Sequence, residues 1–254
     1  RRCGKSFLLS TLYASWLKEQ GVADDHIIDI NLEDRRNKSL RDPDNLLAYI
    51  DSKINDDNMH YIMIDEIQLV PEFEDVLNSY LNMHNADVYV TGSNARFLSS
   101  NVRTEFAGRG DEIRLHPLSF SEFCSIKGDD KTLNLREYMI YGGMPQVVLR
   151  ETEKEKSEVL KALFLRTYIR DIVERYNVKN TDTLDELLDI VASSIGGLTN
   201  PTKLCNTFES VKHEKVNRMT ITSYLGYLCE SFLIERSSQY DIKGKKYIDS
   251  PYKY

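Results

Sequence analysis

Glycine, lysine and serine stand together near the start of the chain, as Gly4-Lys5-Ser6. They match the second half of the phosphate-binding loop G-x-x-x-x-G-K-[ST], whose first glycine would lie two residues before Arg1. In such a loop, backbone N–H groups at a helix start face the phosphates, the lysine reaches the β- and γ-phosphates, and the serine hydroxyl ligates Mg²⁺. A chance match is the alternative, but the triplet also begins an amphipathic helical pattern. The residues expected to bind a nucleotide are Arg2, Cys3, Gly4, Lys5, Ser6 and Phe7.

An apolar run that ends in two acids follows further along the chain, as Tyr61-Ile-Met-Ile-Asp65-Glu66. A buried strand of this kind would place Asp65 beside the phosphate-binding loop, where its carboxylate holds the Mg²⁺. Glu66 would then polarise the attacking water as a general base. The alternative is a strand that ends in surface acids, which is a common arrangement. The metal ligands expected from the two motifs are Ser6 and Asp65.

Two weaker signals follow the next apolar run, 88–90. Ser93 and Asn94 could bind the γ-phosphate or orient the water, although an ordinary turn with a serine or asparagine helix cap is an equal alternative. Arg109 could stabilise the charge on a transferred phosphate, either in its own chain or from a neighbouring one, and the alternative is a solvated arginine. The candidate catalytic residues are therefore Asp65, Glu66, Ser93, Asn94 and Arg109.

The elements that must position these residues alternate between strands and helices up to Pro117. This alternation predicts an α/β fold with a parallel sheet and helices on both faces. The apolar Ile-Met-Ile is typical of a strand that is buried on both faces. The predicted strands cover 26–32, 61–64, 88–90 and 112–115. The predicted helices start at Gly4 and stop at Gly21, and then cover 43–54, 71–84 and 96–106.

Beyond Pro117 the pattern is helical. Short helices are predicted at 119–126 and 135–150, and a long amphipathic helix at 156–176. Three further helices follow, at 182–195, 201–210 and 218–231, and a predicted β-hairpin covers 232–249. Three helices followed by a hairpin is the order of a winged helix.

Composition narrows the classes of function. The 254 residues include 33 Lys and Arg against 40 Asp and Glu, a net charge of −7, which excludes a uniformly basic nucleic-acid coat but allows a local basic patch. No apolar run approaches the roughly 18 residues of a membrane-spanning helix, and nothing at the start suggests secretion.

The four cysteines lack CxxC spacing, so we expect reduced thiols and a cytoplasmic protein. They are Cys3, Cys124, Cys205 and Cys229. The five histidines (26, 60, 84, 116 and 213) show no ligand spacing and are interpreted as scattered.

The segments RRCGKS, IMIDEIQ, VTGSN, AGR, HPLSFSEF and YGGMP have an order and spacing that resembles the bacterial and archaeal AAA-type P-loop ATPases with an uncharacterised C-terminal domain. The resemblance covers nearly the whole chain. It implies an AAA-like core, a small helical lid and a C-terminal winged helix, with ATP and Mg²⁺ as cofactors. A nuclease-like region often follows in such proteins, and the ending KYIDSPYKY resembles its start.

The same resemblance implies roles for single residues. Gly4, Lys5 and Ser6 match the P-loop, Asp65 and Glu66 match Walker B, and Ser93 and Asn94 match the sensor-1 position. Arg109 occupies the place of an arginine finger, which usually acts across a subunit interface, so a homo-oligomer is expected. No clear sensor-2 arginine is present. The first strand and the first loop glycine lie outside the chain, which we interpret as an interior segment of a longer protein.

The sequence leaves three functions open. The leading one is Mg²⁺-dependent ATP hydrolysis coupled to movement of a C-terminal winged-helix domain. The others are a nucleotide-gated DNA-binding switch with little turnover, which would contact DNA through 198–254, and a module whose winged helix docks protein. No membrane partner is expected. The predicted domains are an ATPase core at 1–118, a helical lid and connector at 119–180, and a winged-helix-like domain at 181–254.

Overall fold

The computed structural model describes residues 2–92, 106, 109–213, 215–238 and 251–254. These divide into two compact units, Arg1–Ser157 and Glu158–Tyr254. The predicted core at 1–118 falls in the first unit, and the predicted lid and connector at 119–180 extends over both units. The division into three domains stays a prediction. Within the described ranges, no helix is both long enough and apolar enough to cross a membrane.

The centre of the first unit is a parallel sheet of three strands in the order β1-β2-β3. The strands are β1 (Ile27–Asn31), β2 (His60–Asp65) and β3 (Ala86–Val90). Ile62 of β2 lies opposite Ile28 on one side and Val88 on the other, which fixes the register. The parallel sheet predicted from the alternating pattern is confirmed, with strands close to the predicted bounds.

The fourth predicted strand, 112–115, is wrong. A strand exists only where a neighbour completes its ladder of hydrogen bonds. This segment pairs with none of the three strands, and the side chain of Ile113 is 80% exposed. Two alternating apolar residues were too weak a signal for a strand. The predicted helix at 96–106 lies outside the described residues except for Phe106.

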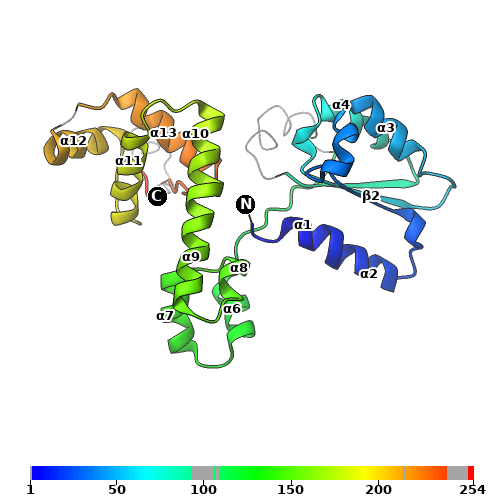
Figure 1. Ribbon diagram of the computed structural model, residues 1–254, viewed down its shortest axis with the longest axis horizontal. Coiled ribbons are helices and arrows are strands. Elements are labelled where there is room, and N and C mark those ends of the chain that lie inside the picture. Colours follow the sequence, from blue (N-terminus) through cyan, green and yellow to red (C-terminus); the bar gives the residue numbers. More distant parts are fainter. Residues whose placement is uncertain (1, 93–105, 107–108, 214, 239–250) are drawn as a thin grey trace, which may run out of the picture. The chain divides into compact units, whose positions relative to one another are not determined.

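Helices cover both faces of the sheet (Figure 1). On one face α3 (Pro43–Asp51) and α4 (Phe73–Tyr80) pack on the side chains that alternate with Met63. That core includes Ile28, Ile30, Leu46, Ile50, Ile62, Ile64, Val76 and Leu77. Asp42 starts α3 by accepting a hydrogen bond from the backbone N–H of Asn45 at 3.1 Å, the usual role of an N-cap.

The opposite face carries the N-terminal helical run, which consists of α1 (Lys5–Phe7), a π-helix (Leu8–Tyr13) and α2 (Ala14–Glu19). Ala14 and Leu17 are buried here with Met63 of β2. Much of the predicted apolar stripe is nevertheless open to solvent, and Trp16 is 51% exposed. The helical run is therefore held to the sheet by a narrow strip of contacts.

After the sheet, the described part of the first unit contains the short helices α6 (Phe120–Lys127), α7 (Lys131–Tyr141) and α8 (Pro145–Val148). A capping box between Ser119 and Glu122 starts α6. The glycine pair after α7 has a packing reason, because a Cβ on Gly143 would lie 2.0 Å from the carbonyl oxygen of Leu118. These helices confirm the predicted segments 119–126 and 135–150 within a few residues.

The second unit is helical in nearly all of its described part. Its first helical run, α9 (Glu153–Leu163), a π-helix (Phe164–Ile169) and α10 (Arg170–Tyr176), confirms the predicted long helix and begins just inside the first unit. The other helices are α11 (Thr181–Ser193), α12 (Pro201–Lys212) and α13 (Arg218–Glu230). They share one apolar core that includes Leu184, Leu187, Phe208, Ile221 and Leu228.

Strand structure in the described part of this unit is limited to two isolated antiparallel bridges, Thr199 with Tyr252 and Ser237 with Lys253. The strand predicted to begin at residue 232 is not formed over residues 232–238. Most of the predicted hairpin, 239–250, lies outside the described residues. The described residues therefore do not show a winged helix. They show a helical region with two isolated bridges.

Candidate nucleotide-binding site

The carboxyl ends of β2 and β3 bring together three oxygen-bearing side chains. Asp65 ends β2, is 3% exposed, and alternates onto the same face as Met63, which is the face covered by the N-terminal helical run. The Ser6 hydroxyl at the start of that run donates a hydrogen bond to Asp65 Oδ1 at 3.0 Å. The hydroxyl of Thr91, which directly follows β3, donates to the same oxygen. The fold therefore joins the two separate sequence motifs.

Glu66 directly follows Asp65 and is nearly buried, with 9% of its surface exposed. Its backbone is left-handed, with φ at 60° and ψ at 45°, which costs a non-glycine residue about 1–2 kcal/mol. Its backbone N–H donates to the hydroxyl of Thr91 at 3.3 Å, and the side-chain amide of Gln68 donates to Glu66 Oε2. These hydrogen bonds hold Glu66 in a strained backbone conformation directly after β2.

The predicted phosphate-binding loop has one feature that only glycine adopts without strain. Gly4 has a φ of 101°, and its carbonyl oxygen accepts the first helical hydrogen bond, from Leu8 N at 2.8 Å. Lys5 opens the helix, and the neighbouring thiol of Cys3 donates to the carbonyl oxygen of Leu115 at 3.3 Å. The side chains of Arg2 and Phe7 are exposed.

The structure does not bring all the predicted site residues together. Ser93 and Asn94 lie outside the described residues. Arg109 is exposed and lines a shallow hollow with Asn78 and Asn82, at the end of α4. Because α4 begins after the carboxyl end of β2 and leads back to the amino end of β3, this hollow lies away from Asp65 along the sheet. Within its own chain, Arg109 is therefore not placed beside the acidic pair.

Sequence reasoning missed Thr91, although a signal was present. Thr91 is the first residue after β3, and the ends of neighbouring parallel strands meet at one edge of the sheet. The motif around it drew attention to the later polar residues, Ser93 and Asn94. The hydroxyl of Thr91 is what links the two acids, since it donates to Asp65 and accepts from the N–H of Glu66.

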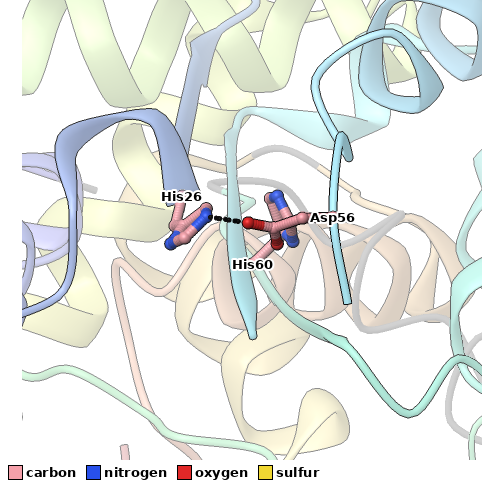
Figure 2. Close-up of side chains that lie close together, drawn as sticks. All are labelled: His26, Asp56 and His60. Carbon is pink, nitrogen blue, oxygen red and sulfur yellow. Dashed lines mark hydrogen bonds and ion pairs between the residues drawn. The ribbon is translucent and has the colours of Figure 1, made fainter. Parts of the chain in front are cut away.

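The sequence interpretation of the five histidines as scattered did not foresee that two of them lie close together. His26 and His60 meet at the amino end of the sheet, together with Asp56 (Figure 2). The sequence feature that could have indicated this contact is the position of both residues at the start of neighbouring strands. His26 immediately precedes β1, and His60 begins β2.

Comparison with known proteins bears on the fold around this site. The family model described as "AAA domain" matches residues 1–124, which contain the Ser6, Asp65 and Thr91 cluster. The matched residues 1–124 are thus similar to an AAA domain. The model of a domain of unknown function, DUF8612, matches residues 132–254, after the segment that matches the AAA domain.

Two curated relatives share both parts of the chain. An uncharacterized protein of Haemophilus influenzae is 36% identical over 260 residues, which cover all of this chain and 64% of the relative. Uncharacterized protein MJ1544 of Methanocaldococcus jannaschii is 28% identical over 259 residues, covering 96% of this chain and 56% of the relative. The chain thus spans less than two thirds of the length of these relatives.

The oxygen atoms at the site suit a hard cation. Mg²⁺ prefers oxygen ligands, typically one or two protein groups together with phosphate oxygens and waters. The Ser6 hydroxyl and the Asp65 carboxylate already lie in hydrogen-bond contact, so both can face one ion. The residues present therefore fit a Mg²⁺ ion shared with a bound nucleotide.

Proposed function

We propose that this protein binds ATP with Mg²⁺ and hydrolyses it. The observation that carries the proposal is the contact between Ser6 at the start of the first helix and Asp65 at the end of β2. It unites a phosphate-loop signature with a buried acid at the carboxyl edge of a parallel sheet, inside a segment that matches an AAA domain. ATP is preferred over GTP by family resemblance, since no base-contacting residue is identified.

Each residue has a distinct proposed task. The ammonium group of Lys5 binds the β- and γ-phosphates, and the Ser6 hydroxyl and Asp65 carboxylate hold the metal ion. Mg²⁺, when bound, neutralises charge on the phosphate oxygens. Glu66 accepts a proton from the water whose oxygen forms the new bond to the γ-phosphorus, while the bond from that phosphorus to the β–γ bridging oxygen breaks and ADP leaves.

The test uses the full-length protein and separates binding from turnover. Lys5→Ala should weaken ATP binding by about 10–100-fold, because a charge-assisted contact to phosphate is lost. Glu66→Gln should keep ATP affinity and lose about 10²–10⁴-fold in turnover, because only proton transfer is removed. The matched controls are Lys18→Ala and Glu72→Gln. Lys18 lies at the exposed end of the same helical run, and Glu72 is another acid with left-handed backbone.

Two results would contradict the proposal. Unchanged ATP affinity in Lys5→Ala removes the phosphate-loop assignment. A wild-type hydrolysis rate in Glu66→Gln removes the general-base assignment while leaving nucleotide binding intact. In that second case a switch that turns over slowly becomes the better description.

A second proposal concerns residues 181–254, which we infer to be a winged-helix-like domain that the ATP cycle moves. Two bridges favour it. Thr199, between α11 and α12, pairs with Tyr252, and the next residue, Lys253, pairs with Ser237 after α13. A short strand between the first two helices, pairing with the returning strand of a hairpin, is the order of a winged helix. DNA or a protein is the proposed partner of this domain.

A further inference from the structure

His26, Asp56 and His60 form a cluster at the opposite edge of the sheet from Asp65 (Figure 2). His26 ends a short 3₁₀-helix (Asp24–His26) just before β1, and His60 is the first residue of β2. Asp56 comes from the loop between α3 and β2. Three separate segments thus place nitrogen and oxygen atoms at one point, distinct from the proposed nucleotide site.

The spacing of these atoms is close to that of ligands around one metal ion. His26 Nε2 lies 3.1 Å from Asp56 Oδ2, and one potential ligand atom from each of the three residues lies within 4.8 Å of the others. Zinc ligands about 2.0–2.1 Å from the metal in a tetrahedron are separated by about 3.3 Å. The 4.8 Å limit is larger than this separation, so the side chains would move closer together when they bind an ion.

His60 supplies the observation that an ordinary ion pair does not explain. Its side chain is fully buried, and Nδ1 lies 2.8 Å from the carbonyl oxygen of Asn58. A carbonyl oxygen only accepts, so Nδ1 carries the proton and Nε2 keeps a free lone pair. Nε2 is buried with no hydrogen-bond partner among the described residues. A metal-binding histidine commonly donates its other ring N–H to a carbonyl in this way.

Asp56 is held in place by the same loop. Its Oδ1 accepts the backbone N–H of Asn58 and its Oδ2 accepts the side-chain amide of Asn58, both at 2.8 Å. These hydrogen bonds, the backbone one first, lower the pKa of Asp56 and keep the carboxylate charged. Asn85 fixes the loop further, because its side-chain amide donates to the carbonyl oxygen of Asp56 at 3.0 Å. The loop therefore presents a carboxylate whose position is largely set in advance.

We propose that His26, Asp56 and His60 bind one divalent transition-metal ion, and that this ion is Zn²⁺. Two imidazoles and a carboxylate suit zinc, whereas Mg²⁺ prefers oxygen ligands alone. The side chain of Asp56 is 41% exposed, which leaves room for water as the fourth ligand. The bound ion ties the starts of β1 and β2 to the loop between α3 and β2.

The competing explanation is a structural ion pair between His26 and Asp56, with His60 as a core residue. That explanation accounts for the 3.1 Å contact but leaves the lone pair of His60 Nε2 buried and unused. Leaving a buried acceptor unsatisfied is destabilising. Coordination uses this atom, which is why the metal site is preferred.

The test is a calorimetric titration of the full-length protein with Zn²⁺, in a reducing buffer and with excess Mg²⁺ to occupy the nucleotide site. One Zn²⁺ should bind per chain. His26→Gln and Asp56→Asn should each weaken Zn²⁺ binding by at least about 10-fold. Removing a residue that only supports a metal ligand already weakens binding by about 10–100-fold, and these two residues are proposed as ligands themselves. Both positions are at least partly exposed, so these variants should fold. His84→Gln and Asp57→Asn, exposed residues outside the cluster, are the matched controls and should bind like the wild type.

A second readout reports the ligands directly. Co²⁺ in the site should give the intense visible absorption of a four-coordinate ion, and Zn²⁺ should remove it. Loss of this absorption in His26→Gln and its retention in His84→Gln supports the proposal. Absence of stoichiometric Zn²⁺ binding in the wild type overturns it. So does equal Zn²⁺ affinity in the wild type, His26→Gln and Asp56→Asn, because the ion would then be bound elsewhere, for example by cysteine thiols.

Discussion

Thr91 connects the two acids at the end of β2 through a single hydroxyl. This hydroxyl donates to the Asp65 carboxylate and accepts from the backbone N–H of Glu66. Thr91 therefore helps fix both the carboxylate and the strained backbone of Glu66. Asp65 and Glu66 have different proposed tasks, one on the metal and one on the water. A group that orients both should affect turnover without contacting the nucleotide.

We predict that Thr91→Val lowers ATP turnover by about 10–100-fold, the usual effect of removing a residue that orients metal ligands. Valine keeps the shape of threonine and removes only the hydroxyl. Thr91→Ser is the control and should retain most of the activity, because it keeps the O–H. Steady-state hydrolysis at several Mg²⁺ concentrations measures the effect. Equal rates in Thr91→Val and wild type would show that Asp65 needs no such support.

Local motifs were readable from sequence, and contacts between distant segments were not. Gly4-Lys5-Ser6 and Asp65-Glu66 are contiguous, so their residue types alone indicated phosphate and metal chemistry. The link from Thr91 to Asp65 depends on how β3 aligns with β2. The meeting of His26 and His60 likewise depends on the alignment of β1 with β2. The positions of these residues at the ends of strands are visible in the sequence, but the strand register that brings them together is not.

Among the elements, helices were predicted more reliably than strands because a helix satisfies its own backbone hydrogen bonds. The segments 43–54 and 182–195 formed helices close to the expected places. The segment 112–115 needed a neighbouring strand that it does not have, and the predicted strand from 232 forms only an isolated bridge within its described residues. A strand therefore needs a partner that the local sequence does not reveal.

The helices after the sheet are tied together by a nearly buried charge cluster. Lys156 of α9 contacts Glu137 of α7 at 2.7 Å, and Lys127 of α6 reaches the same carboxylate oxygen at 3.2 Å. Burial alone would raise the pKa of Glu137, but the hydrogen bonds from the two lysines outweigh it and lower the pKa. The carboxylate thus stabilises the folded state above its unfolded pKa, and this contribution disappears as the pH falls through the lowered, folded-state pKa.

We predict that Glu137→Gln destabilises the first unit by about 2–3 kcal/mol near neutral pH, because it leaves the nearly buried Lys156 without its counter-ion. Lys127→Met is the comparison variant and should cost about 1 kcal/mol or less, since the main pair stays intact. Urea denaturation of each variant measures the difference. The gap between wild type and Glu137→Gln should narrow in acid. A gap that stays constant down to pH 3 would assign the loss to packing instead of charge.

At the level of the whole molecule, the exposed position of Arg109 at the far end of α4 favours action on a neighbouring subunit over action on its own nucleotide. We predict that specific ATPase activity rises with protein concentration and that Arg109→Ala lowers it by roughly 10³-fold or more. Arg114→Ala, another exposed arginine nearby, should have little effect. Full activity in a protein that stays monomeric at all concentrations would exclude a finger supplied by a neighbour.

Charge is distributed unevenly between the two ends of the chain. Residues 198–254 contain nine Lys or Arg and six Asp or Glu, a net charge of 9 − 6 = +3, so the remainder carries −7 − 3 = −10. A basic segment on an acidic protein favours a partner with negative charge. Arg218 and Thr222 lie on α13, the third helix of the proposed winged helix, where a recognition helix would contact a major groove. Lys243, Lys245 and Lys246 belong to the predicted hairpin tip, outside the described residues.

We therefore predict that the full-length protein binds duplex DNA and that the affinity falls as salt rises, because cationic side chains displace counter-ions from phosphates. Changing Lys243, Lys245 and Lys246 together to alanine should weaken binding and lower the slope of log affinity against log salt by about one for each lysine that contacts a phosphate. Replacing Lys18, Lys38 and Lys53, exposed or partly exposed lysines of the first unit, removes the same charge elsewhere and should leave the slope unchanged. If the wild type fails to bind DNA at low salt, or if the first triple variant keeps the wild-type affinity and slope, the basic segment docks protein instead.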